Sequence, residues 1–152
     1  MEDFSRTIQI RWSDMDANRH LRHSAYYDYG AAMRIMVFSD SGLTLKKLEE
    51  FEIGPILFRE EAIFKREIRL DDKITVDVVL VKSTADFARW SLRHHFIKED
   101  GTIVASLNID GAWMDLIKRK LVVPNELVQR IFASFPKTPD YELIPRKQGP
   151  GL

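Results

Sequence analysis

The stretch that decides the fold is residues 11–29, RWSDMDANRHLRHSAYYDY, which joins an alternating segment to a long apolar one. Residues 7–12 alternate apolar and polar side chains, with Trp12 on the apolar side, and this period of two predicts a strand. Residues 25–38 are nearly all apolar or aromatic, which predicts a helix buried on most sides, with Ser24 as its N-cap. The polar cluster therefore falls at a helix N-terminus, where amide donors and the helix dipole favour an oxyanion.

Four strand-like runs follow the helix, and short turns join them. They cover residues 56–70, 74–80, 87–97 and 103–113. The first run alternates imperfectly, because Glu60 and Arg66 interrupt its apolar face, and so long a strand usually bends or bulges. Short turns make neighbouring strands antiparallel. The order of elements predicts an α+β fold in which one curled antiparallel sheet of five strands wraps around the long helix.

The chain is long enough for one domain. It has 152 residues with 45% hydrophobic side chains, enough for one core of ordinary size. Pro124 precedes an amphipathic segment with apolar residues at helical spacing, which predicts a second helix. Prolines and glycines among charges from residue 136 onward predict a loose tail. We expect a domain over residues 1–135 and a tail over residues 136–152.

The overall composition excludes several classes of function. Lys plus Arg and Asp plus Glu balance at 23 each, so no global field recruits nucleic acid. The chain has no cysteine, which excludes disulfides, thiolate metal sites and a cysteine nucleophile. No apolar run approaches the roughly 20 residues of a membrane span. The acidic N-terminus lacks the features of a signal peptide, so we expect a cytoplasmic protein without nucleic-acid or membrane partners.

The polar cluster has a recognisable spacing: Asp14-x-Asp16-x-Asn18-x-His20-x-x-His23, followed by Tyr26 and Tyr27. This pattern resembles the signature of the hotdog-fold acyl-CoA thioesterases, in particular the branch that includes 4-hydroxybenzoyl-CoA thioesterase. The order of elements is similar to that family over most of the chain. Two departures stand out, because Arg19 replaces the usual glycine and Arg22-His23 replace the usual pair of asparagines.

The resemblance implies a hotdog fold and a thioester hydrolase. Thioester hydrolysis needs a nucleophile or an activated water, together with donors for the developing oxyanion. A serine elbow of the G-x-S-x-G type is absent from the sequence, whereas a partly desolvated carboxylate can act as general base or nucleophile. The resemblance implies that Asp16 does this work and that the backbone N–H of His23 points at the thioester oxygen. It also implies that His20 orients the loop or the water.

Further expectations concern the substrate and the assembly. We assign to substrate binding the side chains of Asn18, Arg22, Tyr26 and Glu61. The resemblance implies an acyl-CoA substrate and no cofactor beyond the CoA of that substrate. Hotdog proteins pair through a sheet edge, so a homodimer or homotetramer is expected.

Each site assignment has a structural alternative. Asp14 and Asp16 both suit a turn that closes a strand-to-helix loop, and for Asp14 we prefer that interpretation to catalysis. His20 and His23 suit hydrogen-bonded loop histidines, and Tyr26 suits packing of the helix into the sheet. The same aspartates and histidines also suit a metal site. We rank that site lower because the spacing is not diagnostic and the resemblance implies no metal.

Two strand residues also invite a structural interpretation. His94 falls on an apolar face, which is typical of a hydrogen-bonded core histidine. Glu61, with its neighbour Glu60, interrupts an apolar strand and suits an ion pair with a nearby base such as Arg59.

Other functions fit the same fold. One is an acyl-CoA or acyl-carrier-protein binding module without turnover, and another is a structural oligomer whose polar loop is only a turn. A dehydratase is a weaker alternative, because its usual Asp-His pair is placed differently. The fold alone does not separate these functions.

Overall fold

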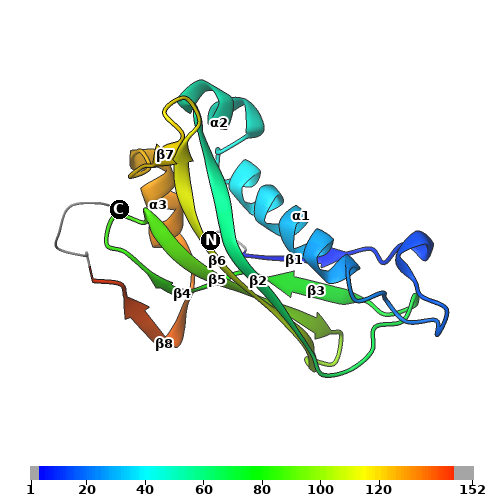
Figure 1. The fold of residues 1–152 in the computed structure, drawn as a ribbon. Coiled ribbons are helices and arrows are strands. Elements are labelled where there is room, and N and C mark those ends of the chain that lie inside the picture. Colours follow the sequence, from blue (N-terminus) through cyan, green and yellow to red (C-terminus); the bar gives the residue numbers. More distant parts are fainter. Residues whose placement is uncertain (1–3, 146–152) are drawn as a thin grey trace.

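A long helix and a curled sheet make up most of residues 4–145, the part of the chain that the computed structural model describes (Figure 1). In chain order the elements are β1 (Ser5–Ile8), η1 (Trp12–Asp14), α1 (Ala25–Asp40), α2 (Leu45–Phe51), β2 (Ile53–Phe64), β3 (Ile74–Asp77), β4 (Val79–Ser83), β5 (Arg89–Lys98), β6 (Ile103–Asp115), β7 (Lys120–Leu121), α3 (Glu126–Ser134) and β8 (Lys137–Leu143). The second predicted helix is α3. The curled sheet and its long helix confirm the predicted α+β fold.

The sheet runs from β2 through β6 and β5 to β3 and β4, which continue one strand line on either side of Val78. At the far side β1 pairs with β3 and β8 pairs with β4. All pairings are antiparallel except that between β4 and β8. The bend expected in the long strand is a register shift in β2 between Leu57 and Arg59. The five expected strand lines are therefore all present, with β7 and β8 added.

The segment after α3 departs from the loose tail expected from residue 136. Lys137–Leu143 forms β8, and the amide of Leu80 in β4 donates to the carbonyl of Pro136 at 2.8 Å. Tyr141 holds the pairing from its side chain, because its hydroxyl lies 2.7 Å from Ser83 Oγ. Prolines are compatible with this strand because an edge strand needs donors on one side only. The rest of the expected tail, residues 146–152, lies outside the described residues.

The core lies between α1 and the inner face of β5 and β6. Leu92, Leu107 and Ile109 are fully buried, as is Met33 of α1. Helix and sheet approach each other closely at Gly30, where an added Cβ would collide with the side chain of Leu107. A larger residue at this position would push the start of α1 away from the sheet.

One face of α1 is exposed, so burial on most sides was too strong an expectation. The buried positions follow a helical stripe, but Ile35 and Met36 are 39% and 38% exposed. The neighbouring Ala31 and Ala32 are exposed as well. The apolar composition of this helix therefore exceeds what the core of one chain requires.

A buried polar pair joins α1 to β5. Arg34 Nη1 lies 3.0 Å from Nε2 of His94, and His94 Nδ1 lies 2.7 Å from the carbonyl oxygen of Asp77. Burial, followed by the charge of Arg34, lowers the pKa of His94 to about 3, so the ring is neutral. The neutral ring then donates from Nδ1–H and accepts at Nε2 from the guanidinium. This confirms the expectation of a hydrogen-bonded core histidine.

Candidate active site

The loop that joins β1 to α1 folds back on itself. The amide of Arg22 donates to the carbonyl of Asp14 at 2.8 Å, and the amide of Asp16 donates to the carbonyl of His20 at 2.8 Å. Arg19 lies at the tip of this turn with φ of 65°, in the left-handed region that favours glycine. The geometry explains the glycine of the family pattern, and this chain keeps the turn with arginine in its place.

Asp14 anchors the loop to α1. Its side chain is buried, and it accepts hydrogen bonds from Arg11 Nε at 2.8 Å, Arg22 Nη2 at 2.9 Å and the hydroxyl of Tyr29 at 2.8 Å. The hydrogen bond from Arg11 is the main reason that the pKa of this carboxyl lies below its usual range. These contacts favour the structural interpretation of Asp14.

The same anchor explains where the first strand ends. The predicted strand over residues 7–12 stops at Ile8, and Trp12, expected on the apolar face, is 78% exposed. The amide of Asp14 donates to the carbonyl of Arg11, which starts the one-turn η1 helix. The chain therefore leaves the sheet early and turns the Trp12 ring outward.

Asp16 presents its two carboxylate oxygens to different surroundings. Oδ1 accepts hydrogen bonds from the backbone amides of Asn18 at 2.9 Å and His20 at 3.0 Å. Within residues 4–145, Oδ2 accepts no hydrogen bond from the protein. The residue is exposed and borders a cavity. In the same side chain, Oδ1 therefore stabilises the turn while Oδ2 is available for chemistry.

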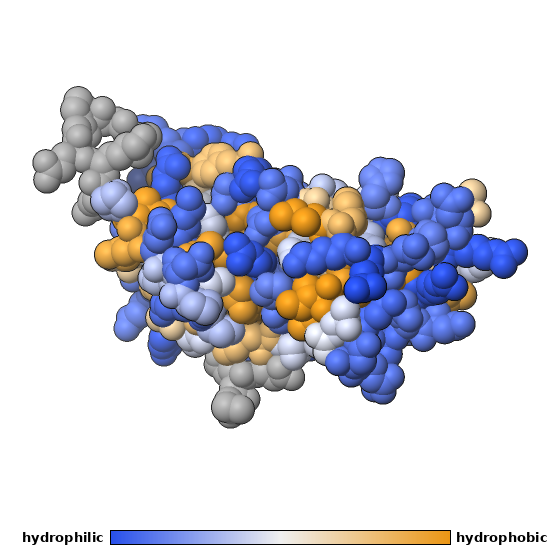
Figure 2. Space-filling model, turned by 90° about the horizontal axis from the view of Figure 1, so that it is seen from below, coloured by the Kyte–Doolittle hydropathy of each residue, from blue (hydrophilic) through white to orange (hydrophobic). Residues whose placement is uncertain are grey.

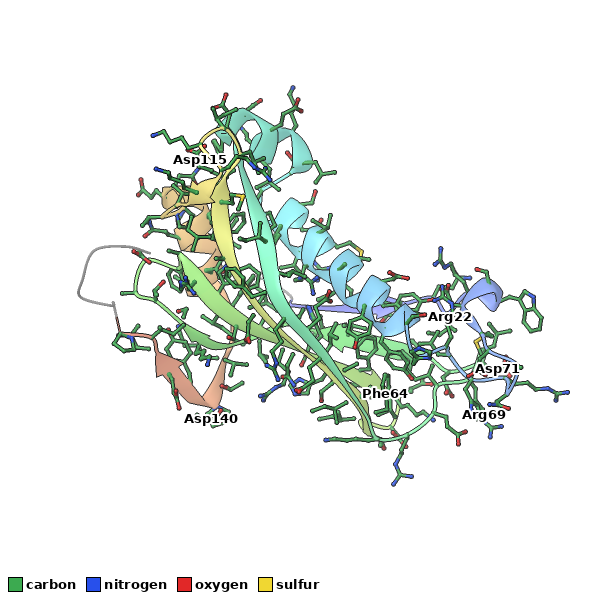
Figure 3. The ribbon with its side chains drawn as sticks, viewed as in Figure 1. Arg22, Phe64, Arg69, Asp71, Asp115 and Asp140 are labelled. Atoms are coloured by element: carbon green, nitrogen blue, oxygen red, sulfur yellow. The ribbon has the colours of Figure 1, made fainter. Side chains whose placement is uncertain are left out.

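A cavity of about 370 Å³ opens between this loop and the segment that follows β2. It is lined by Asp16, His20, Leu21, His23, Tyr26, Phe64, Lys65, Arg66 and Glu67. Its volume lies in the range of small-molecule sites. Figure 3 labels Arg22, Phe64 and Arg69 at this end of the molecule. The same end is mostly hydrophilic in Figure 2, at the right of the view.

The start of α1 forms one wall of the cavity. In the part of the chain that the structure describes, the backbone N–H of His23 donates to no protein acceptor. It lies two residues before the first residue of α1, where the positive end of the helix dipole lies. Tyr26 follows in the first turn and is 3% exposed, with its ring edge-on to Phe64 at 4.9 Å. Burial, followed by the charge of Asp16, raises the pKa of Tyr26 to about 12, so its hydroxyl remains a donor.

The segment after β2 forms the opposite wall, which the sequence did not single out. The amide of Leu21 donates to the carbonyl of Ile68 at 2.7 Å and holds the two walls together. Beside that bond, Nε2 of His20 lies 2.8 Å from Oε2 of Glu67. The sequence did carry one signal for this wall. Arg66 interrupts the alternation of apolar and polar residues just after β2 ends at Phe64.

The structure brings together four of the predicted site residues. Asp16, His20, His23 and Tyr26 all line the cavity. Asn18 lies outside it and contributes its backbone amide to the turn.

The other two residues assigned to substrate binding are engaged elsewhere. Arg22 bonds Asp14 and Ser24, and it does not line the cavity. Glu61 lies on the outer face of the sheet, 2.8 Å from Arg59 and 3.2 Å from Asn108 Nδ2. The ion pair with Arg59 matches the structural alternative for this glutamate.

Two broader features of residues 4–145 concern metal ligands and membrane spans. No three His, Asp or Glu side chains in that range gather as metal ligands. None of the helices there combines the length and the apolar character needed to cross a membrane.

A curled antiparallel sheet around a long helix, with a cavity at the helix N-terminus, defines a hotdog protein. The chain belongs to the thioesterase-like superfamily, whose family model matches residues 10–132. No curated protein matches the chain.

Solved structures share this fold. A hypothetical protein from Staphylococcus aureus in complex with CoA has a TM-score of 0.81 and 19% identity, over 95% of this chain and 89% of that one. A 1,4-dihydroxy-2-naphthoyl-CoA thioesterase from Synechocystis has a TM-score of 0.77 and 14% identity, over 86% and 96%. A DHNA-CoA thioesterase from Staphylococcus aureus has a TM-score of 0.70 and 16% identity, over 78% of each chain. At these identities the likeness confirms the hotdog fold.

Proposed function

We propose that this protein hydrolyses acyl-CoA thioesters in the cavity at the start of α1. The observation that carries the proposal is the shared lining, because Asp16, which bears a carboxylate, and His23, which bears a backbone N–H unbonded within residues 4–145, both line the same cavity. One supplies a base or nucleophile and the other a donor for an oxyanion. The named thioesterases among the similar structures, and the one bound to CoA, support this substrate class.

The reaction follows from these two groups. Asp16 takes a proton from water, whose oxygen bonds to the thioester carbon, or the carboxylate attacks that carbon itself. In either route the carbonyl electron pair moves onto oxygen, and the His23 N–H stabilises the oxyanion. When the carbonyl reforms, the carbon–sulfur bond breaks and the CoA thiolate leaves. The thiolate takes the proton held by Asp16 in the first route and a proton from solvent water in the second. In the second route, water then hydrolyses the acyl-enzyme anhydride.

The remaining lining suits the two parts of the substrate. Leu21, Tyr26 and Phe64 provide an apolar and aromatic wall for the acyl group. Lys65 and Arg66 have no acidic partner among residues 4–145 and suit the phosphates of CoA. CoA thioesters and a chain without cysteine fit a cytoplasmic location.

Thiol release from a panel of acyl-CoAs tests the proposal. The wild type should release CoA from at least one member, and Asp16→Asn should lower kcat/KM by about a hundredfold or more. Asp71→Asn is the matched control, because Asp71 is exposed and lies outside the cavity lining. This control should retain wild-type activity.

Two results would count against hydrolysis at this site. Full activity in Asp16→Asn would leave Asp16 as a turn residue only. No thiol release from any acyl-CoA, together with thermal stabilisation by the same compounds, would instead indicate a binding module without turnover.

We also propose that the protein forms a homodimer through β2. Within the described residues β2 pairs with β6 along one edge only, and its other edge is unpaired. Phe58, Ile63 and Phe64 on this strand are 56%, 44% and 49% exposed. An unpaired edge with exposed apolar side chains favours strand pairing with another chain, here a second copy. Because Phe64 lines the cavity, that second copy would also border the site.

A further inference from the structure

We infer that Glu67 is a positioning residue that holds the ring of His20 at the cavity with Nδ1 as its proton-accepting nitrogen. The inference rests on the proposed function, since it assigns His20 to the attacking water. Glu67 was not singled out in the sequence, because nothing in the local pattern connects it to the histidine.

His20 and Glu67 are in direct contact, and a neighbouring backbone hydrogen bond holds their segments together. His20 Nε2 lies 2.8 Å from Glu67 Oε2, and both residues line the cavity. Leu21 follows His20 and Ile68 follows Glu67 in the sequence. The amide of Leu21 donates to the carbonyl of Ile68 at 2.7 Å, and this hydrogen bond fixes the two segments against each other. The backbone N–H of His20 also donates to Asp16 Oδ1 at 3.0 Å. The backbone of His20 is thus held beside the proposed catalytic carboxylate.

The chemistry of a carboxylate determines the tautomer of the ring. An ionised Glu67 only accepts hydrogen bonds, so Nε2 of a neutral His20 must carry the proton. The lone pair then lies on Nδ1, which has no hydrogen-bond partner among residues 4–145. A water in the cavity can donate one hydrogen to Nδ1 while Asp16 accepts the other. With both hydrogens engaged, a lone pair of that water is available for the thioester carbon.

The exposure of the pair makes the inference testable without unfolding the protein. The side chains of His20 and Glu67 are 31% and 55% exposed. Ion pairs of this kind contribute little to stability. Removal of the Glu67 carboxylate should therefore change the tautomer of the His20 ring and the reaction rate, and leave the fold unchanged.

The experiment combines nitrogen NMR of the histidine rings with steady-state kinetics. Wild type, Glu67→Ala, Glu67→Gln and the control Asp71→Asn are compared across a pH series, and the His20 tautomer is taken from the plateau of the neutral form. The wild type should carry the proton on Nε2, and Glu67→Ala should show a mixture of tautomers. Glu67→Gln should retain the wild-type tautomer, because its amide oxygen still accepts from Nε2–H.

The kinetics should follow the tautomer. Glu67→Ala should lower kcat by about tenfold with a smaller change in KM, and Glu67→Gln should recover most of that loss. A wild-type ring protonated on Nδ1, or an unchanged tautomer in Glu67→Ala, would overturn the inference. An altered tautomer with unchanged kcat would also overturn the inference, since the His20 tautomer that Glu67 sets would then have no effect on the reaction. Absence of thiol release in the wild type would instead count against the proposed function, and NMR would still decide the tautomer.

Discussion

At the scale of single residues, the two aspartates of the motif differ in what surrounds them. Asp14 is 2% exposed and has partners at both of its oxygens. Asp16 is exposed, and within residues 4–145 it has partners at one oxygen only. A carboxylate bound by two guanidinium groups is a poor base, whereas one with an available oxygen in a cavity remains reactive. The local contacts therefore separate a structural aspartate from the catalytic candidate.

Asp14→Asn should destabilise the protein by about 1–3 kcal/mol near neutral pH, because it removes charged hydrogen bonds from a buried anchor. The folded pKa of Asp14 lies below its ordinary value of 3.8, so its contribution is complete above that value. The contribution is lost as the pH falls through the lowered pKa. Urea unfolding of both proteins near neutral pH and at about pH 3 should show the difference shrink in acid. An equal difference at both pH values would contradict this role.

Some of the site was readable from sequence and some was not. The spacing in residues 14–23 placed Asp16, His20 and His23 together, because residues in one short loop stay close whatever the rest of the fold does. Glu67 was missed because its partner lies far away in the sequence, and only the packing of two segments brings them together. Trp12 was misplaced because alternation predicts a strand without revealing that a side-chain anchor ends it early.

At the scale of elements, α1 sets the position of the site. The first turn of α1 contains Tyr26, which lines the cavity. The close approach of the helix to the sheet at Gly30 fixes the position of this turn. The exposed face with Ile35 and Met36 plays no part in this contact. The depth of the cavity therefore depends on a contact one turn further along the helix.

Gly30→Ala should destabilise the protein by about 1–3 kcal/mol, because the new methyl group collides with Leu107 across a packed core. It should also lower activity, since displacement of α1 moves the His23 amide. The matched control is Ala32→Ser on the exposed face, which should change the free energy of unfolding by less than about 0.5 kcal/mol. Thermal unfolding and thiol release measure both effects. Equal behaviour of the two variants would contradict the close approach.

The strands were easier to predict than their boundaries. Alternation is a local property, and it located the five main strand lines and the irregularity in β2. The strand β8 was missed because its pairing with β4 is non-local and its proline, Pro139, is typical of loops. Edge strands tolerate proline, so composition alone misjudged this segment.

At the scale of the whole molecule, the outer face of the sheet carries a network of polar side chains. Ser91 Oγ donates to Asp110 at 2.6 Å, and Arg93 Nε donates to Asn108 at 2.8 Å. Hydrophobic and hydrophilic areas also alternate over the surface in Figure 2. The exposed apolar residues along the unpaired edge of β2 contrast with this network. This contrast supports the proposed self-association through the edge of the sheet.

Ile63→Lys should reduce self-association, because it places a charge on the strand that we propose as the interface. Ile117→Lys is the matched control, since Ile117 is 69% exposed but lies in the turn after β6. Light scattering coupled to size exclusion should show a dimer for the wild type and the control, and a shift toward monomer for Ile63→Lys. A monomeric wild type, or a dimer unaffected by Ile63→Lys, would contradict the proposed interface.

The most direct test of the central claim is a structure of the protein with an acyl-CoA analogue in which a methylene group replaces the thioester sulfur. We expect the carbonyl oxygen of the analogue to lie about 3 Å from the His23 nitrogen. We also expect Asp16 Oδ2 to face the carbonyl carbon, directly or through one water. A carbonyl bound away from the start of α1, with Asp16 remote from it, would contradict the account.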